Sequence, residues 1–67
     1  MKSKRAQVEE ALATEIRNGD VGRCYGLALA LAILVDSSTD EELWRVAEAN
    51  GLMDVAVPMF KWTVGRS

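Results

Sequence analysis

Ten consecutive residues, GLALALAILV from Gly26 to Val35, carry neither a charge nor a hydrogen-bonding side chain. A segment that is apolar on every side needs cover on every side, and a chain of 67 residues has little left to supply it. In all, 49% of the residues are apolar, which is more than a small core can hide. The run therefore predicts a central element that packs against its own chain on one side. On the other side it predicts contact with a second copy or another protein.

The secondary structure of this run has two interpretations. Alternating leucine and alanine fits a half-buried strand of period two. Against this, both residues are strong helix formers, and the full apolar run, Cys24 to Val35, exceeds ordinary strand length. The run is also shorter than the about 20 residues that a membrane-spanning helix needs. With Asp20 placed to cap it, we predict a helix over residues 21–35 and no membrane association.

This predicted helix has two apolar faces when its residues are placed at about 100° each. The face expected to meet the core carries Cys24, Leu27, Leu31, Leu34 and Val35. The opposite face, predicted as a dimer interface, carries Gly22, Gly26, Leu29 and Ile33. A glycine inside a helix costs about 1 kcal/mol relative to alanine, but the two here form a notch into which another backbone can approach. The alternative is that both glycines lie in a frayed first turn and matter little.

Two neighbouring helices follow from local signals. Residues 4–18 carry one narrow apolar stripe and end at Gly19, a residue that accepts the left-handed conformation after a helix. A helix over residues 40–50 begins in DSSTDEEL, which holds two overlapping capping boxes, and ends at Gly51. The boxes pair Ser38 with Glu41 and Thr39 with Glu42. Leu52 is expected to fold back onto Val46 or Ala47.

The C-terminal stretch stays ambiguous between helix and strand. Asp54 is placed to cap a helix over residues 55–63 in which Pro58 would fall in the first turn. Phe60, Trp62 and Val64 instead alternate with polar residues, as in a strand that would need a partner strand. We predict an all-α single domain over residues 1–67, with three to four short helices in an intertwined or side-by-side homodimer.

Catalysis and metal binding find little support in the composition. Cys24 is the single cysteine, so an internal disulfide is excluded, and the chain has no histidine to act as general base or metal ligand. Cys24 lies in an apolar segment, where a thiol is usually inert. Adjacent carboxylates such as Glu41 and Glu42 diverge around a helix. We predict no enzyme, no cofactor and no metal, and expect a cytoplasmic protein because no signal-peptide pattern is present.

A DNA-binding function is the alternative hypothesis. The segment VAEANGL, Val46 to Leu52, resembles the first helix and turn of a helix-turn-helix, with Val57 and Phe60 near its buried positions. The would-be recognition helix, DVAVPMFKW, offers only Lys61 to a phosphate or base edge, whereas direct readout uses Arg, Lys, Asn or Gln. The net charge of −2 also argues against nucleic acid as a partner.

Aromatic and sulfur-containing residues mark a second candidate surface for binding a partner protein. Within nineteen residues lie Trp44, Met53, Met59, Phe60 and Trp62. Trp is enriched at binding hot spots and Met at adaptable surfaces, although any one of them can equally belong to the core. In size, helical economy and lack of catalytic groups, the chain resembles the small accessory proteins that bacteriophages make to block or redirect host proteins. That resemblance implies an inhibitor, adaptor or modulator of another protein.

Overall fold

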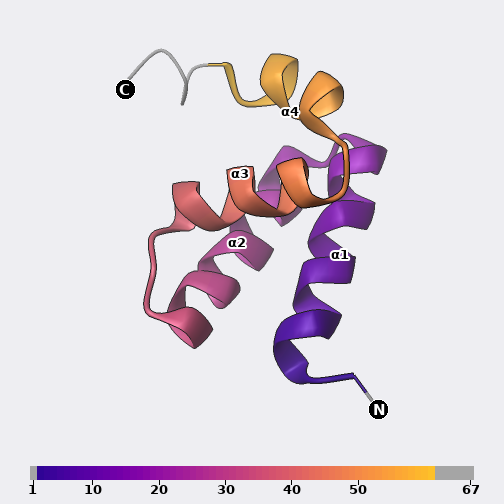
Figure 1. The fold of residues 1–67 in the computed structure, drawn as a ribbon. Helices are drawn as coiled ribbons and strands as arrows, with labels where there is room; N and C mark the ends of the chain where they lie inside the picture. The colour runs from indigo at the N-terminus through magenta and orange to yellow at the C-terminus, as the bar shows by residue number, and fades with distance from the viewer. Residues whose placement is uncertain (1, 62–67) are drawn as a thin grey trace.

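The computed structural model describes residues 2–61, which form four helices and no strand. In chain order these are α1 (Lys4–Asn18), α2 (Val21–Val35), α3 (Thr39–Ala49) and α4 (Met53–Met59). α2 packs against both α1 and α3, and the short α4 covers the end of the bundle where α1 finishes (Figure 1). The predicted all-α class is therefore confirmed for the described residues.

Local capping signals set the junction between α1 and α2, as predicted. Gly19 has φ 78°, and the backbone N–H of Asp20 donates to the carbonyl of Glu15 at 3.1 Å, which closes α1. The Asp20 carboxylate then accepts from the backbone N–H of Arg23 at 3.1 Å and opens α2. A tight reversal with satisfied backbone groups brings α1 and α2 side by side.

The start of α3 has the N-cap of one of the two predicted capping boxes, but the Glu41 carboxylate accepts from the Ser37 hydroxyl at 2.9 Å. The Ser38 hydroxyl accepts from the backbone N–H of Glu41 at 3.1 Å, so Thr39 is already helical and cannot be the cap. Glu42, predicted to complete the second box, is instead buried. At the other end of α3, the backbone N–H of Leu52 donates to the carbonyl of Ala47 at 2.8 Å, as predicted, and Leu52 is buried.

A single core joins all four elements. Its largest fully buried side chains are Phe60, Leu12, Ile16, Leu31, Leu43, Val46 and Cys24. The buried face of α2 differs from the prediction, because it is centred on Ala28 and Ala32, and Leu34 is 51% exposed. Small alanine side chains let neighbouring helices approach closely, and this rotates Leu34 toward solvent.

The C-terminal helix corrects the predicted boundaries of 55–63. α4 starts two residues earlier, at Met53, and Asp54 does not cap it; Leu52 stands at the cap position with no side-chain hydrogen bond. Pro58 lies near the end of the helix instead of in its first turn. Because proline has no N–H to donate back to the carbonyl of Asp54, α4 lacks one helical hydrogen bond there. Trp62 and Val64, on which the strand alternative depended, lie outside the described residues.

Candidate interaction surface

The predicted dimer face of α2 lies on the surface of the single chain. Gly22 and Gly26 are exposed, Leu29 is 52% exposed and Ile33 is 74% exposed. These residues recur every three or four positions and so share one side of the helix. The structure therefore brings all four predicted residues together on a surface that the rest of the described chain leaves uncovered.

The two glycines of this face are not required by the packing of their own chain. A Cβ added to Gly26 would meet nothing within 4 Å, and one added to Gly22 would meet only the Asp20 carboxylate at 3.8 Å. Both sites lie within a helix, where glycine is less stable than alanine by about 1 kcal/mol. The fold of the single chain therefore gives no reason for glycine at either position.

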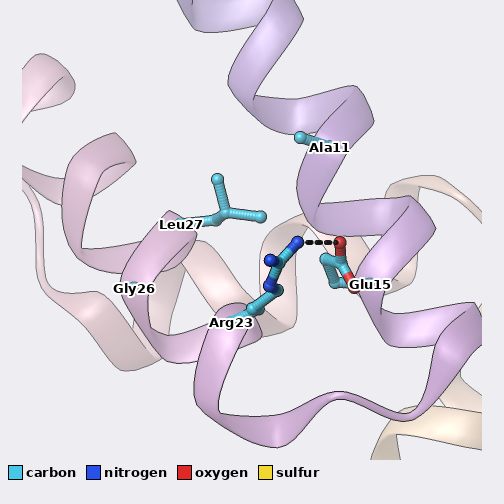
Figure 2. A pocket seen from close by; sticks show the side chains of 5 residues that line it. All are labelled: Ala11, Glu15, Arg23, Gly26 and Leu27. Atoms are coloured by element: carbon cyan, nitrogen blue, oxygen red, sulfur yellow. Dashed lines mark ion pairs between the residues drawn. The ribbon is translucent and has the colours of Figure 1, made fainter.

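A shallow open groove adjoins Gly26, between α1 and α2. It has a volume of about 390 Å³ and is lined by Ala11, Glu15, Arg23, Gly26 and Leu27 (Figure 2). Arg23 reaches across it to the Glu15 carboxylate at 3.5 Å and also lies 3.8 Å from the Asp20 carboxylate. At these distances both ion pairs are loose, and the Arg23 side chain remains 72% exposed.

The second predicted surface is mostly part of the core. Phe60, predicted to bind a partner, is completely buried, because its ring is held edge-to-face between Tyr25 and Trp44 at centroid distances of 5.5 and 5.8 Å. Trp44, Met53 and Met59 are half-buried and pack against the same core. Trp62 lies outside the described residues. The aromatic cluster therefore serves mainly to dock α4, and the single-core interpretation applies to Phe60.

A charged network that the sequence analysis missed ties α1 to α3. The Arg45 guanidinium donates to the Glu42 carboxylate at 2.6 and 3.0 Å and to the Glu9 carboxylate at 2.6 Å. These hydrogen bonds hold the pKa of both carboxyl groups below the ordinary glutamate range, although burial opposes the shift. The spacing of Glu42 and Arg45, three residues apart on one helix, was a local signal for half of this network.

Reactive groups are sparse among residues 2–61. Cys24 is fully buried, and burial raises the pKa of its thiol to about 11, with smaller contributions from the Glu15 and Asp20 carboxylates. No three carboxylate or thiol side chains in this part of the chain are placed to hold a metal ion. Within residues 2–61, the feature that stands out is therefore exposed apolar surface and not a cluster of metal-ligating side chains.

The segment that resembles a helix-turn-helix forms a helical corner between α3 and α4, with Gly51 at φ 66°. Phe60 is buried as that resemblance implied, but Val57 is 44% exposed and Ala56 is buried in its place. The exposed residues of α4 are Asp54, Val55, Val57 and Pro58. Within α4, this outward surface is apolar and acidic.

Comparison with known proteins finds no matching family model, no matching curated protein and no matching solved structure. As to membranes, no single helix within residues 2–61 is long and apolar enough to cross one. Only α2 and α3 taken together have the necessary length and composition, and they are bent by 103° at their junction.

Proposed function

We propose that the protein is a non-catalytic protein-interaction module that forms a homodimer through the exposed face of α2. The observation that carries this proposal is the exposure of Leu29 and Ile33 beside two glycines that the single chain does not need. A large apolar side chain next to an unfilled notch, repeated along one helix, gives the shape that helix–helix packing uses.

The free energy gained by burying the apolar side chains of this face limits how tight such a dimer can be. Complete burial of one leucine or isoleucine side chain is worth about 1.5–3 kcal/mol, and these two are only partly exposed. Four such side chains at a two-fold interface compete with a loss of translational and rotational freedom of about 4–15 kcal/mol. We therefore expect a concentration-dependent dimer rather than a permanent one.

In this proposal the dimer inhibits, links or modulates another protein, and α4 provides the second surface. Val55 and Val57 are exposed on α4, next to the half-buried Met53 and Met59. The candidate partner-binding set therefore shifts from the buried Phe60 to the outward side of the same helix. Methionines at the edge of an apolar surface suit a contact that adapts to its partner.

DNA binding remains the alternative function, but no specific observation favours it. The exposed positions of α4 carry no arginine, lysine, asparagine or glutamine. Those side chains are the ones that read base edges and contact phosphates, so within residues 53–61 only the exposed Lys61, just beyond α4, could make such a contact.

The proposal is tested by light scattering and by the substitution Gly26→Leu. The wild type should show a rise in mass with concentration over about 10–500 µM, the range in which weak complexes form. At a dimer interface the new side chain overpacks the contact by about 1–3 kcal/mol and shifts the protein to monomer. In a permanent monomer the same change is at an open helical site and should raise stability, because leucine favours helix over glycine.

A dimer through α2 and a permanent monomer predict different results in these experiments. A wild type that stays monomeric throughout, or a more stable Gly26→Leu variant that is still dimeric, contradicts the α2 interface. Leu34→Ala, exposed on another side of α2, serves as a control that changes apolar volume without filling the notch. A salt-sensitive shift of a labelled DNA duplex would support the alternative function instead.

A further inference from the structure

We propose that the two α2 helices of the dimer pack antiparallel, with Ile33 of each copy seated over Gly26 of the other. This inference rests on the proposed dimer and adds its direction and register. Ile33 is the most exposed large apolar side chain among residues 2–61, and Gly26 faces open space on the same side of the helix. The two positions lie seven residues, or about 10.5 Å, apart along the helix axis.

Complementary side-chain size favours the antiparallel arrangement. If the two-fold axis passes between Leu29 and Ala30, each Ile33 lies opposite the partner's Gly26, and this match occurs twice by symmetry. A parallel pair in register would place isoleucine on isoleucine at one end and glycine on glycine at the other. That arrangement crowds one end and leaves a void at the other, whereas close packing requires large side chains to meet small ones.

The charges at the two ends of α2 favour the same direction. Near its start, Arg23 is largely exposed and held only by loose ion pairs. Its end carries Asp36 and no basic residue in the last turn, so an acidic group stands at the negative end of the helix dipole. Asp40 and Glu41, both exposed, follow immediately.

In the proposed register these ends meet across the interface. Arg23 and Asp36 are each about 10 Å from the two-fold axis, on opposite sides of it along the helix. The Arg23 end of one helix therefore lies at the same level along the axis as the acidic end of its partner, with Arg23 on the flank that faces α1 (Figure 2). A parallel pair would instead bring the two acidic ends together. The partner's Arg23 would add positive charge near an end of α2 whose own last turn has no basic residue.

Disulfide trapping tests the register. In a Cys24→Ser background, which removes the single native thiol, we would prepare Gly26→Cys and Ile33→Cys, one of them carrying a mass tag. Circular dichroism checks that each variant folds, with Cys24→Ala as the replacement background if serine is not accepted. Since a disulfide needs Cα atoms within about 7 Å, mild oxidation should cross-link the mixture several-fold faster than either variant alone.

Asp54→Cys, exposed on α4 away from the interface, should cross-link slowly in every combination. If Gly26→Cys or Ile33→Cys cross-links as fast alone as in the mixture, the antiparallel register is overturned, while the dimer itself stands. If light scattering shows only monomer at every concentration, both the register and the dimer are wrong.

Charge reversal supplies an independent readout. Arg23→Glu should weaken the dimer several-fold and make it more sensitive to salt, and Asp36→Lys added to it should restore part of the affinity. Lys4→Glu changes charge by the same amount at an exposed position of α1 outside the proposed face, and should leave the dissociation constant nearly unchanged. Equal weakening by Arg23→Glu and Lys4→Glu would mean that only net charge matters, which contradicts the antiparallel contact.

Discussion

Arg45 of α3 donates to the Glu9 carboxylate of α1 across 36 residues of sequence, at 2.6 Å, while it also holds the buried Glu42. The Glu42 side chain is only 5% exposed, so its charge depends on this guanidinium for compensation. α1 and α3, which are separated in sequence by the whole of α2, are thereby joined by a polar contact at the edge of the core.

This network predicts that stability falls in acid. Because the folded pKa of Glu9 and of Glu42 is below the ordinary value of 4.5, ionisation of these groups stabilises the fold at higher pH. The free energy of unfolding should change little with pH near neutrality. It should then decrease as the pH falls below about 4.5 and the carboxylates take up protons, measured by urea denaturation.

Arg45→Gln should lower the free energy of unfolding by about 1–3 kcal/mol, because Glu42 stays buried without its partner. Part of the acid dependence should disappear as well, since burial then favours the neutral carboxyl group. Arg5→Gln is the matched control: Arg5 contacts Glu9 at 3.4 Å on the surface, and its loss should change stability little. Equal effects of the two substitutions would contradict the role of Arg45.

The start of α3 predicts different effects for two adjacent hydroxyl residues. Ser38→Ala removes the acceptor for the backbone N–H of Glu41 and should cost about 1 kcal/mol of stability. Thr39→Ala, one residue later and inside the helix, should be neutral or slightly stabilising because alanine is the better helix former. Thermal or chemical denaturation of both variants measures the difference. A larger loss of stability for Thr39→Ala than for Ser38→Ala would mean that Ser38 is not the N-cap of α3.

Asp36 predicts opposite effects on folding and on dimer formation. It ends α2 with φ 55°, a conformation that costs an ordinary residue about 1–2 kcal/mol and glycine little. Asp36→Gly should therefore raise the stability of the dilute chain by about 1 kcal/mol. The same change removes the charge proposed to face Arg23 of the partner, so the dimer should become weaker in light scattering. Asp36→Asn separates the effects, because it removes the charge but still tolerates this conformation.

Cys24 predicts slow reaction with thiol reagents. Its side chain is fully buried, and its pKa of about 11 leaves little thiolate at neutral pH. Native protein should be labelled far more slowly than protein in concentrated urea. Rapid labelling of the native state would show that α2 opens readily or is rotated in its packing.

The limits of α1 and α2, and those of α3 to within one residue, could be predicted because their signals are local. Gly19, Asp20 and Ser38 act within three or four residues of themselves, so the sequence pattern contains the whole cause. α4 has no such signal: Leu52 caps it without a side-chain hydrogen bond, and its position depends on burial of Phe60. The same applies to Glu9 and Arg45, whose contact exists only after α1 and α3 have packed.

The candidate interface was predictable for a related reason. Periodicity alone places Gly22, Gly26, Leu29 and Ile33 on one side of a helix, whatever covers the other side. Periodicity did not fix the exact centre of the buried face, so Leu34 was assigned to the core although the packing of Ala28 and Ala32 turns it outward. Phe60 was likewise ambiguous, since an aromatic residue near the end of a small domain can pack inward or bind outward.

The position of Phe60 also affects the order in which the helices of one chain fold. α1, α2 and α3 are sequential neighbours in contact, and we expect these contacts to form early because short loops close at little entropic cost. The edge-to-face contact of Phe60 with Tyr25 closes a much longer loop and is expected to form last. α4, with seven residues and one deeply buried aromatic anchor beyond its end, should then be the first element to detach. Its amide protons would exchange with solvent ahead of those in α2, and equal protection of the two helices would argue for a single cooperative unit.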